Sequence, residues 1–337
     1  SLMADAQIVY GSQTSLYIAT QKWINPLLSV GQVPTGQETV IDKFDVSDPD
    51  ATTFVSAGEV PGYLLNQFSL SEYNGYLRVA STSRPIWWGA APPATLSQSY
   101  VTVLASQGGL LVPVGQVSGL GQGEQIYSVR FVDDAGYVVT YRQVDPLYTL
   151  DLSTPTAPKV VGQLELEGYS AYLHPLGNGL LLGVGQDVST ATNEPTGAQI
   201  ELFDVSDPAA PKLLSKTSLG SGSSTQVQYD HHAFLYWPAT NLAVLPIQVY
   251  AVTTTVLVPG LPVSSSQPFD GAIGYRVTGS GISEVAPIVQ DQVNGSVPTI
   301  ERSIVIGDQL YTISDLGVMA SSLDTLARQA FVAFPTA

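Results

Sequence analysis

Cysteine is absent from this chain of 337 residues, which excludes disulfide bonds, thiolate metal sites and a cysteine nucleophile. No apolar run reaches about 18 residues, so we expect no segment of this chain to insert into a membrane. Lysine occurs only five times, and the formal net charge is −16. A surface that follows phosphate groups needs clustered Lys and Arg, so nucleic acid is excluded as a partner.

What the chain has in abundance is short runs of β-branched and aromatic residues, broken by Gly, Pro, Asn and Asp. Such runs are typical of β-strands, and pairs of runs separated by turn residues indicate hairpins. The clearest pair is joined by Asn74-Gly75, a strong signal for a two-residue hairpin turn. Hairpins are predicted in this way at residues 8–19, 68–80, 127–140, 169–184 and 302–314.

A short phrase is repeated along the chain. Residues 44–49 read Phe-Asp-Val-Ser-Asp-Pro, residues 203–212 repeat the phrase and extend it with Ala-Ala-Pro-Lys, and residues 150–159 hold a diverged copy. The Asp and Ser side chains can hydrogen-bond to their own backbone and the prolines end a strand, so we interpret the phrase as a turn between two strands. The repeating unit has about 53 residues, as the spacings of 106 and 53 show between Asp45, Asp151 and Asp204.

Four strands in a unit of about 50 residues are typical of a propeller blade, so the predicted fold is an all-β propeller of four-stranded antiparallel blades. We assign residues 1–6 to a tag or linker and residues 7–337 to a single propeller domain, with insertions at about 84–99 and 253–269. The blades either close a ring by themselves or belong to a larger ring of about seven or eight blades. Six blades are counted, beginning near Gln7, Gln67, Ile126, Tyr169, Val227 and Ile300.

Residues 58–80 carry a resemblance to a known family, and residues 124–131, 141–147 and 172–175 continue it in the same order. These strings resemble secreted bacterial and archaeal proteins that have a C-terminal β-propeller domain, and the repeated phrase is similar to repeats of the LVIVD type. The resemblance extends from about Gln7 to Ile247. It implies an exported protein, located outside the cell or in the cell envelope, with further strand-rich sequence upstream. It implies no catalytic residues.

The three histidines are the residues best suited to bind a metal. Alignment of the hairpins places His174 in the first strand of one blade and Asp230 and His231 in that of the next. In a propeller this strand lines the central channel. Adjacent residues of a strand point to opposite faces, so His231 and His232 face the channel together only if a bulge intervenes. The alternative is that these side chains pack between blades and bind no metal. Candidate ligands for a divalent metal such as Zn²⁺ are His174, Asp230, His231 and His232.

Other residues are candidates for binding a partner. Trp87 and Trp88 lie in the 84–99 insertion, while Arg130 and Tyr172 lie in first strands of blades. The chain has no nucleophile elbow and no phosphate-binding loop. We therefore favour a non-enzymatic binding or scaffold module that needs no cofactor and presents loops of one propeller face to a protein or glycan. Two alternatives stay open: a metal-dependent enzyme with a His and Asp site at the channel, and an architectural domain of the cell envelope.

Overall fold

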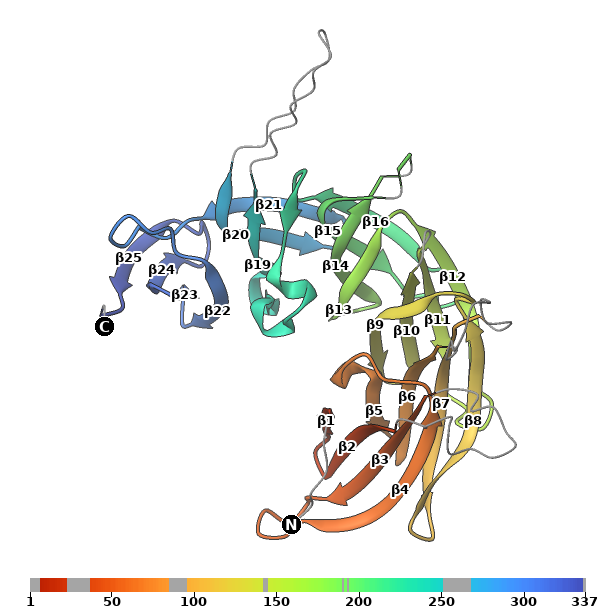
Figure 1. Ribbon diagram of the computed structural model, residues 1–337. Coiled ribbons are helices and arrows are strands. Elements are labelled where there is room, and N and C mark those ends of the chain that lie inside the picture. Colours follow the sequence, from red (N-terminus) through yellow and green to blue (C-terminus); the bar gives the residue numbers. More distant parts are fainter. Residues whose placement is uncertain are drawn as a thin grey trace, which may run out of the picture. The chain divides into compact units, whose positions relative to one another are not determined.

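The computed structural model describes residues 7–22, 37–84, 96–141, 145–189, 191–192, 194–250 and 268–335. Over these residues the chain forms β-strands and short 3₁₀ turns, without any α-helix (Figure 1). Three of the sheets are four-stranded and antiparallel, as the repeat length predicts. The all-β propeller prediction is confirmed. The two predicted insertions lie mostly outside the described residues.

The chain divides into two compact units. The first unit comprises Ser1–Leu166 together with Pro208–Pro211, and it holds three blades. A short parallel pairing of β4 with β8 joins the first two blades into one eight-stranded sheet. The strands are β1 (Ile8–Gly11), β2 (Ser15–Lys22), β3 (Glu38–Asp45) and β4 (Thr53–Pro61) in blade 1; β5 (Leu70–Tyr73), β6 (Tyr76–Ser83), β7 (Gln98–Gln107) and β8 (Leu110–Leu120) in blade 2; and β9 (Gln125–Val132), β10 (Ala135–Tyr141), β11 (Asp145–Asp151) and β12 (Lys159–Leu166) in blade 3.

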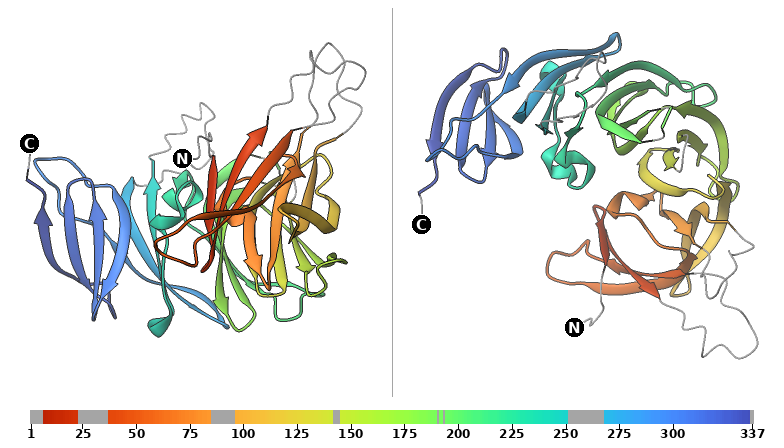
Figure 2. Two further views of the ribbon diagram at one scale, coloured as in Figure 1. Left: turned by 90° about the horizontal axis from the view of Figure 1, so that it is seen from below. Right: turned by 45° about the horizontal axis from the view of Figure 1, so that its top comes forward.

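The second unit comprises Glu167–Asp207 and Lys212–Ala337 and also holds three blades (Figure 2). Two of them are regular, and blade 5 is interrupted by 3₁₀ turns. The strands are β13 (Tyr169–Gly177), β14 (Leu180–Val188), β15 (Pro195–Asp204) and β16 (Lys212–Ser218) in blade 4; β17 (Ser223–Ser224), β18 (Leu235–Trp237), β19 (Leu242–Val249), β20 (Phe269–Thr278) and β21 (Gly281–Ile288) in blade 5; and β22 (Ile300–Ile306), β23 (Gln309–Ser314), β24 (Gly317–Ser322) and β25 (Arg328–Ala333) in blade 6.

The predicted hairpins form as the turn residues indicate. Asn74 and Gly75 join β5 to β6 with φ values of 50° and 80°, which is the left-handed conformation that a two-residue hairpin turn requires. The other hairpins pair β1 with β2, β9 with β10, β13 with β14, and β22 with β23. The five predicted hairpins are therefore present.

The repeated phrase is a turn between the third and fourth strands of a blade, as predicted. The Asp45 carboxylate accepts a hydrogen bond from the Ser47 backbone N–H at 2.8 Å. Asp151 and Asp204 accept the same bond from the serine two residues later, each at 3.0 Å. These serine hydrogen bonds lower the pKa of all three carboxyl groups. The phrase therefore closes its turn with an ionised aspartate.

The prolines of the phrase have a second role, which is to pack against the fourth strand of the preceding blade. A Cβ atom at Gly115 of β8 would lie 2.3 Å from the Pro155 carbonyl oxygen and 2.6 Å from Cδ of Pro158. At Gly162 of β12, a Cβ atom would lie 2.3 Å from the Pro208 carbonyl oxygen. Glycine at these strand positions makes room for the backbone of the turn, so neighbouring blades approach closely.

Apolar cores lie between neighbouring blades, as expected for repeats that bury their faces against each other. One core joins blades 1 and 2, a second joins blades 2 and 3, and a third joins blades 5 and 6. Each core combines fully buried residues from the central strands of both blades, namely Ile41 with Leu77, Val101 with Val138, and Val244 with Leu310.

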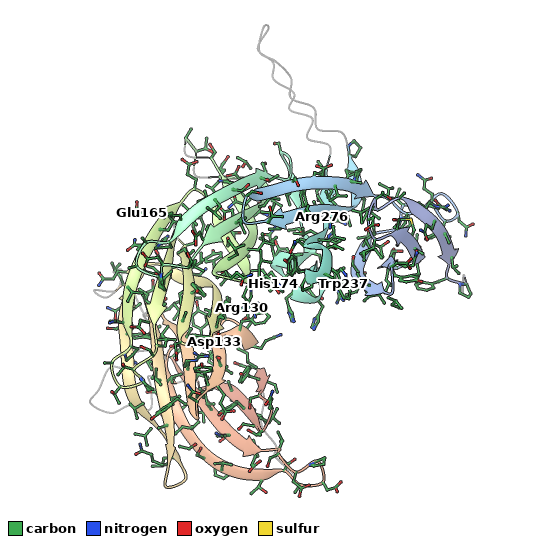
Figure 3. All side chains as sticks on the ribbon, turned by 180° about the vertical axis from the view of Figure 1, so that it is seen from behind. Arg130, Asp133, Glu165, His174, Trp237 and Arg276 are labelled. Atoms are coloured by element: carbon green, nitrogen blue, oxygen red, sulfur yellow. The ribbon has the colours of Figure 1, made fainter. Side chains whose placement is uncertain are left out.

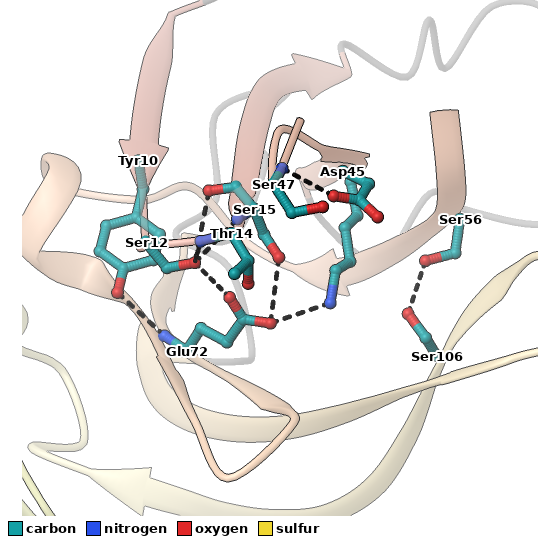
Figure 4. Close-up of polar contacts among 10 residues, drawn as sticks. Tyr10, Ser12, Thr14, Ser15, Asp45, Ser47, Ser56, Glu72 and Ser106 are labelled. Carbon is teal, nitrogen blue, oxygen red and sulfur yellow. Dashed lines mark hydrogen bonds and ion pairs between the residues drawn. The ribbon is translucent and has the colours of Figure 1, made fainter. Parts of the chain in front are cut away.

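A polar cluster also ties blade 1 to blade 2 (Figure 4). The Glu72 carboxylate on β5 accepts hydrogen bonds from the Ser12 hydroxyl at 2.5 Å and the Ser15 hydroxyl at 3.2 Å, and it pairs with Lys43 Nζ at 2.9 Å. The Glu72 backbone N–H donates to the Tyr10 hydroxyl at 3.1 Å. Burial by itself raises the pKa of Glu72, but Ser12, Lys43 and Tyr17 together hold it below its ordinary value.

Candidate functional site

The predicted site residues fall in different parts of the chain. Trp87 and Trp88 lie outside the described residues. Arg130 lies on β9 in the first unit, where its guanidinium stacks 3.8 Å from the centroid of the Phe68 ring (Figure 3). A guanidinium over an aromatic face is a cation–π contact. Arg130 therefore has a packing partner inside its own unit, whereas the remaining predicted residues belong to the second unit.

Tyr172 and His174 lie on β13 of blade 4, two residues apart and hence on the same face of the strand. The Tyr172 hydroxyl and His174 Nδ1 are hydrogen-bonded at 3.0 Å. Tyr172 is buried and His174 is half-buried. The His174 ring contacts Phe234 and Tyr236, with centroids 4.9 and 5.5 Å apart. Strand β13 therefore packs against residues that blade 5 contributes.

Residues 225–241 depart from the blade pattern. Here the chain forms three 3₁₀ turns, η3 (Gln226–Gln228), η4 (His231–Ala233) and η5 (Pro238–Thr240), with the short strand β18 between the last two. Asp230 caps η4, since its carboxylate accepts the His232 backbone N–H at 3.0 Å. The prediction that Asp230 and His231 belong to a first strand is therefore wrong.

The 3₁₀ turn η4 brings three of the candidate ligands together. In a 3₁₀ turn, unlike a strand, neighbouring side chains are not forced to opposite faces. The ligand atoms of Asp230, His231 and His232 all lie within 4.8 Å of one another. The two imidazole rings have centroids 3.9 Å apart, and His232 Nδ1 lies 3.1 Å from Asp230 Oδ1. His174 is not part of this group, although the sequence placed it there.

An arginine from blade 6 completes the polar arrangement. Arg302 on β22 donates from Nη2 to Asp230 Oδ2 at 2.5 Å. Burial by itself raises the pKa of Asp230, but the hydrogen bonds from the His232 backbone and from Arg302 hold it below its ordinary value. The Asp230 carboxylate is therefore ionised at neutral pH. The His232 side chain, 68 % exposed, is accessible to solvent beside it.

Aromatic rings surround this cluster. Tyr172 stacks on His231 with centroids 6.5 Å apart, and it also contacts Phe234 at 5.4 Å. Tyr229 is 83 % exposed, next to Asp230 in the chain. The sequence predicted the histidines and Tyr172 as site residues but not Phe234 or Tyr236. The signal was present, because residues 229–237 contain four aromatic residues, including Trp237.

These contacts define an aromatic and imidazole surface in the second unit, which we call the 225–241 surface. It comprises the described side chains of the 225–241 segment together with those of β13 and Arg302 that contact them. Its carboxylate and imidazoles can bind a cation, and its exposed aromatic ring can pack against a ligand.

The fold and the repeated turns define a β-propeller protein. The chain belongs to the Beta propeller domain family, whose sequence pattern matches residues 1–326. An uncharacterized protein of Methanocaldococcus jannaschii is 41 % identical over 197 residues, which are 58 % of this chain and 29 % of that protein. An uncharacterized protein of Archaeoglobus fulgidus is 41 % identical over 187 residues, which are 56 % of this chain and 27 % of that protein. The matched part thus spans less than a third of either archaeal relative.

Among solved structures, the periplasmic gluconolactonase PpgL of Pseudomonas aeruginosa is similar, with a TM-score of 0.53. It is 13 % identical, and the match covers 98 % of this chain and 85 % of that one. At this identity the likeness supports the fold alone. Within the part of the chain that the structure describes, no helix has the length and apolar character needed to cross a membrane.

Proposed function

We propose that this chain is an exported, non-enzymatic binding or scaffold module that presents the 225–241 surface to a protein or glycan partner. The observation that carries this proposal is the irregular segment itself. In a repeat protein, segments that depart from the repeat are often the binding loops, because regular strands are needed for packing while loops are free to vary.

The composition of the surface favours a protein partner over a glycan. Tyr, Trp and Arg dominate the binding energy of protein interfaces, and Phe is enriched in them. Tyr229, Tyr236 and Trp237 come from the irregular segment, and Arg302 from β22. The exposed ring of Tyr229 resembles an anchor that fills a partner's pocket. The overall negative charge adds a long-range preference for a basic partner.

Export and location in the cell envelope are part of the same proposal. Their support is the resemblance of residues 58–80 and of the three later strings to secreted propeller proteins. The architectural alternative, in which the domain only spaces other domains, predicts no ligand for the 225–241 surface. Fractionation of cells that produce the full-length protein tests the location, since the proposal expects it outside the cytoplasm.

The binding test compares Tyr229→Ser with Tyr250→Ser. Both tyrosines are exposed, at 83 % and 63 %, but Tyr250 lies outside the 225–241 segment. Each variant and the wild-type chain are titrated against purified envelope proteins of the source organism and against a panel of glycans. We expect binding to a protein that Tyr229→Ser weakens at least tenfold and Tyr250→Ser leaves unchanged. Equal loss in both variants would contradict the assignment of this surface, and binding to glycans alone would replace the protein partner.

A further inference from the structure

We propose that Asp230, His231 and His232 bind one divalent first-row transition cation, such as Zn²⁺, Ni²⁺ or Co²⁺. The proposal concerns the same surface as the partner site but stands apart from it, because cation binding needs these three side chains and no partner. It rests on the spacing of the ligand atoms, on the hydrogen bond that holds the carboxylate and on the accessibility of the site.

The spacing of the ligand atoms is close to that of a tetrahedral metal site. Bonds of about 2.1 Å to nitrogen and oxygen place neighbouring ligand atoms about 3.4 Å apart. His232 Nδ1 and Asp230 Oδ1 are already 3.1 Å apart. The other separations within the group are at most 4.8 Å, so the ligand atoms need to approach one another by no more than about 1.4 Å to reach that spacing. The His232 side chain is mostly exposed, so solvent and ions can reach it.

The carboxylate of the site is also held in place. Arg302 donates to Asp230 Oδ2 at 2.5 Å, while Oδ1 accepts the His232 backbone N–H at 3.0 Å and keeps a second lone pair that faces His232 Nδ1. Carboxylates that bind metals are commonly held in this way by an outer hydrogen bond. Arg302 is therefore a positioning residue, since it orients the carboxylate without itself being a ligand. Its positive charge reduces the attraction for a cation, so binding depends on the two imidazole nitrogens as ligands.

The ligand types select the class of metal. Imidazole nitrogen suits zinc, nickel, cobalt and copper, whereas calcium and magnesium prefer sites made of oxygen ligands. Three protein ligands leave at least one position open, as in catalytic rather than structural zinc sites. Water or a donor atom of a bound partner can occupy that position.

His174 provides an internal control. It is the third histidine of the chain, and its Nδ1 is hydrogen-bonded to the Tyr172 hydroxyl at 3.0 Å. Because it lies outside the group of three, its replacement should leave metal binding intact. The sequence alone could not separate the three histidines, and the structure divides them into two ligands and one residue packed among aromatic rings.

The experiment is calorimetric titration of the untagged chain with Zn²⁺, Ni²⁺ and Co²⁺, together with absorption spectroscopy of the Co²⁺ form. We expect one equivalent to bind and a visible Co²⁺ spectrum. We expect His232→Ala and Asp230→Asn to weaken binding at least tenfold, and His174→Ala to change it less than twofold. Far-ultraviolet circular dichroism checks that each variant is folded. The His232 side chain is mostly exposed, so we expect its replacement to leave the fold intact.

Three results would overturn the proposal: no binding at millimolar cation, unchanged binding in His232→Ala, or a loss in His174→Ala equal to that in His232→Ala. The Tyr229→Ser variant separates this proposal from the partner site. This variant should keep its metal affinity even if it no longer binds a partner. If the wild-type chain binds the metal but no partner is found, the cation site is supported and the proposed partner site is not.

Discussion

The docking of the repeated turn onto the preceding blade leads to a quantitative prediction for Gly115→Ala. Gly115 lies on β8, and the turn of blade 3 approaches it through Pro155 and Pro158. The new Cβ atom would lie 2.3 Å from a backbone carbonyl oxygen and 2.6 Å from a proline ring carbon. Neither group belongs to a flexible side chain, so relief requires movement of the backbone.

The size of the effect follows from that movement. Real Cβ contacts essentially never fall below 3.0 Å, so the Pro155 carbonyl has to retreat by about 0.7 Å. Forcing an extra carbon into a well-packed contact destabilises a protein by about 1–3 kcal/mol. The lower entropy of an unfolded chain with alanine offsets about 0.4–1 kcal/mol of this. We expect Gly115→Ala to lower the free energy of unfolding by about 1–2 kcal/mol.

Urea unfolding followed by tryptophan fluorescence measures this change, with Gly11→Ala as the matched control. Gly11 is the last residue of β1, and a Cβ atom there meets nothing within 4 Å. Gly11→Ala should be within about 0.5 kcal/mol of wild type. If Gly115→Ala is as stable as Gly11→Ala, the turn does not pack rigidly on β8 and this explanation of the prolines is wrong.

Two further predictions concern buried carboxyl groups. Burial raises the pKa of Glu201 to about 7, and Lys216 opposes the shift. Between the ordinary value of 4.5 and about 7 the folded protein binds more protons than the unfolded chain, so the stability of the wild type falls as the pH rises. The free energy of unfolding of Glu201→Gln, measured in urea, should therefore rise relative to that of the wild type by roughly 3 kcal/mol between pH 4 and pH 8. A difference that stays constant over this pH range would refute the prediction. For Glu72, donors such as Lys43 outweigh burial and lower the pKa. The ionised Glu72 therefore stabilises the fold at neutral pH, and this stabilisation is lost as the pH falls through the folded-state pKa. Glu72→Gln should be less stable than wild type at pH 7 and approach the wild-type stability near pH 3. Stability curves of the two proteins that stay parallel over pH would contradict this.

Much of the fold could be predicted because its signals are local. The Asn74-Gly75 turn needs only the left-handed conformations that these two residues tolerate, and the Asp-x-Ser turns need only hydrogen bonds across two residues. The repeat spacing then supplied the number of strands in a blade. The predicted blade starts near Gln67, Ile126 and Ile300 agree with the observed strands or the turn before them.

The candidate site was predicted less well, because it depends on a segment that departs from the repeat. Alignment to the hairpins placed Asp230 and His231 on a strand, where alternation would separate the ligands. In the structure the side chain of Asp230 caps a 3₁₀ turn. Asp is a common capping residue, but the alignment assigned this segment to a strand. Phe234 and Tyr236, which contact the His174 ring, come from another blade, and no sequence pattern of β13 indicates them.

The sequence by itself determined the propeller fold, the position of its turns and the presence of histidine and carboxylate near one another along the chain. These features follow from interactions within a few residues and from a period that repeats them. Only the tertiary structure decided which side chains meet. It brought Arg302 of β22 to Asp230, set His174 apart from the other two histidines, and gave the repeated prolines a glycine to pack against. Contacts between blades join residues tens of positions apart, and their geometry depends on how complete sheets stack.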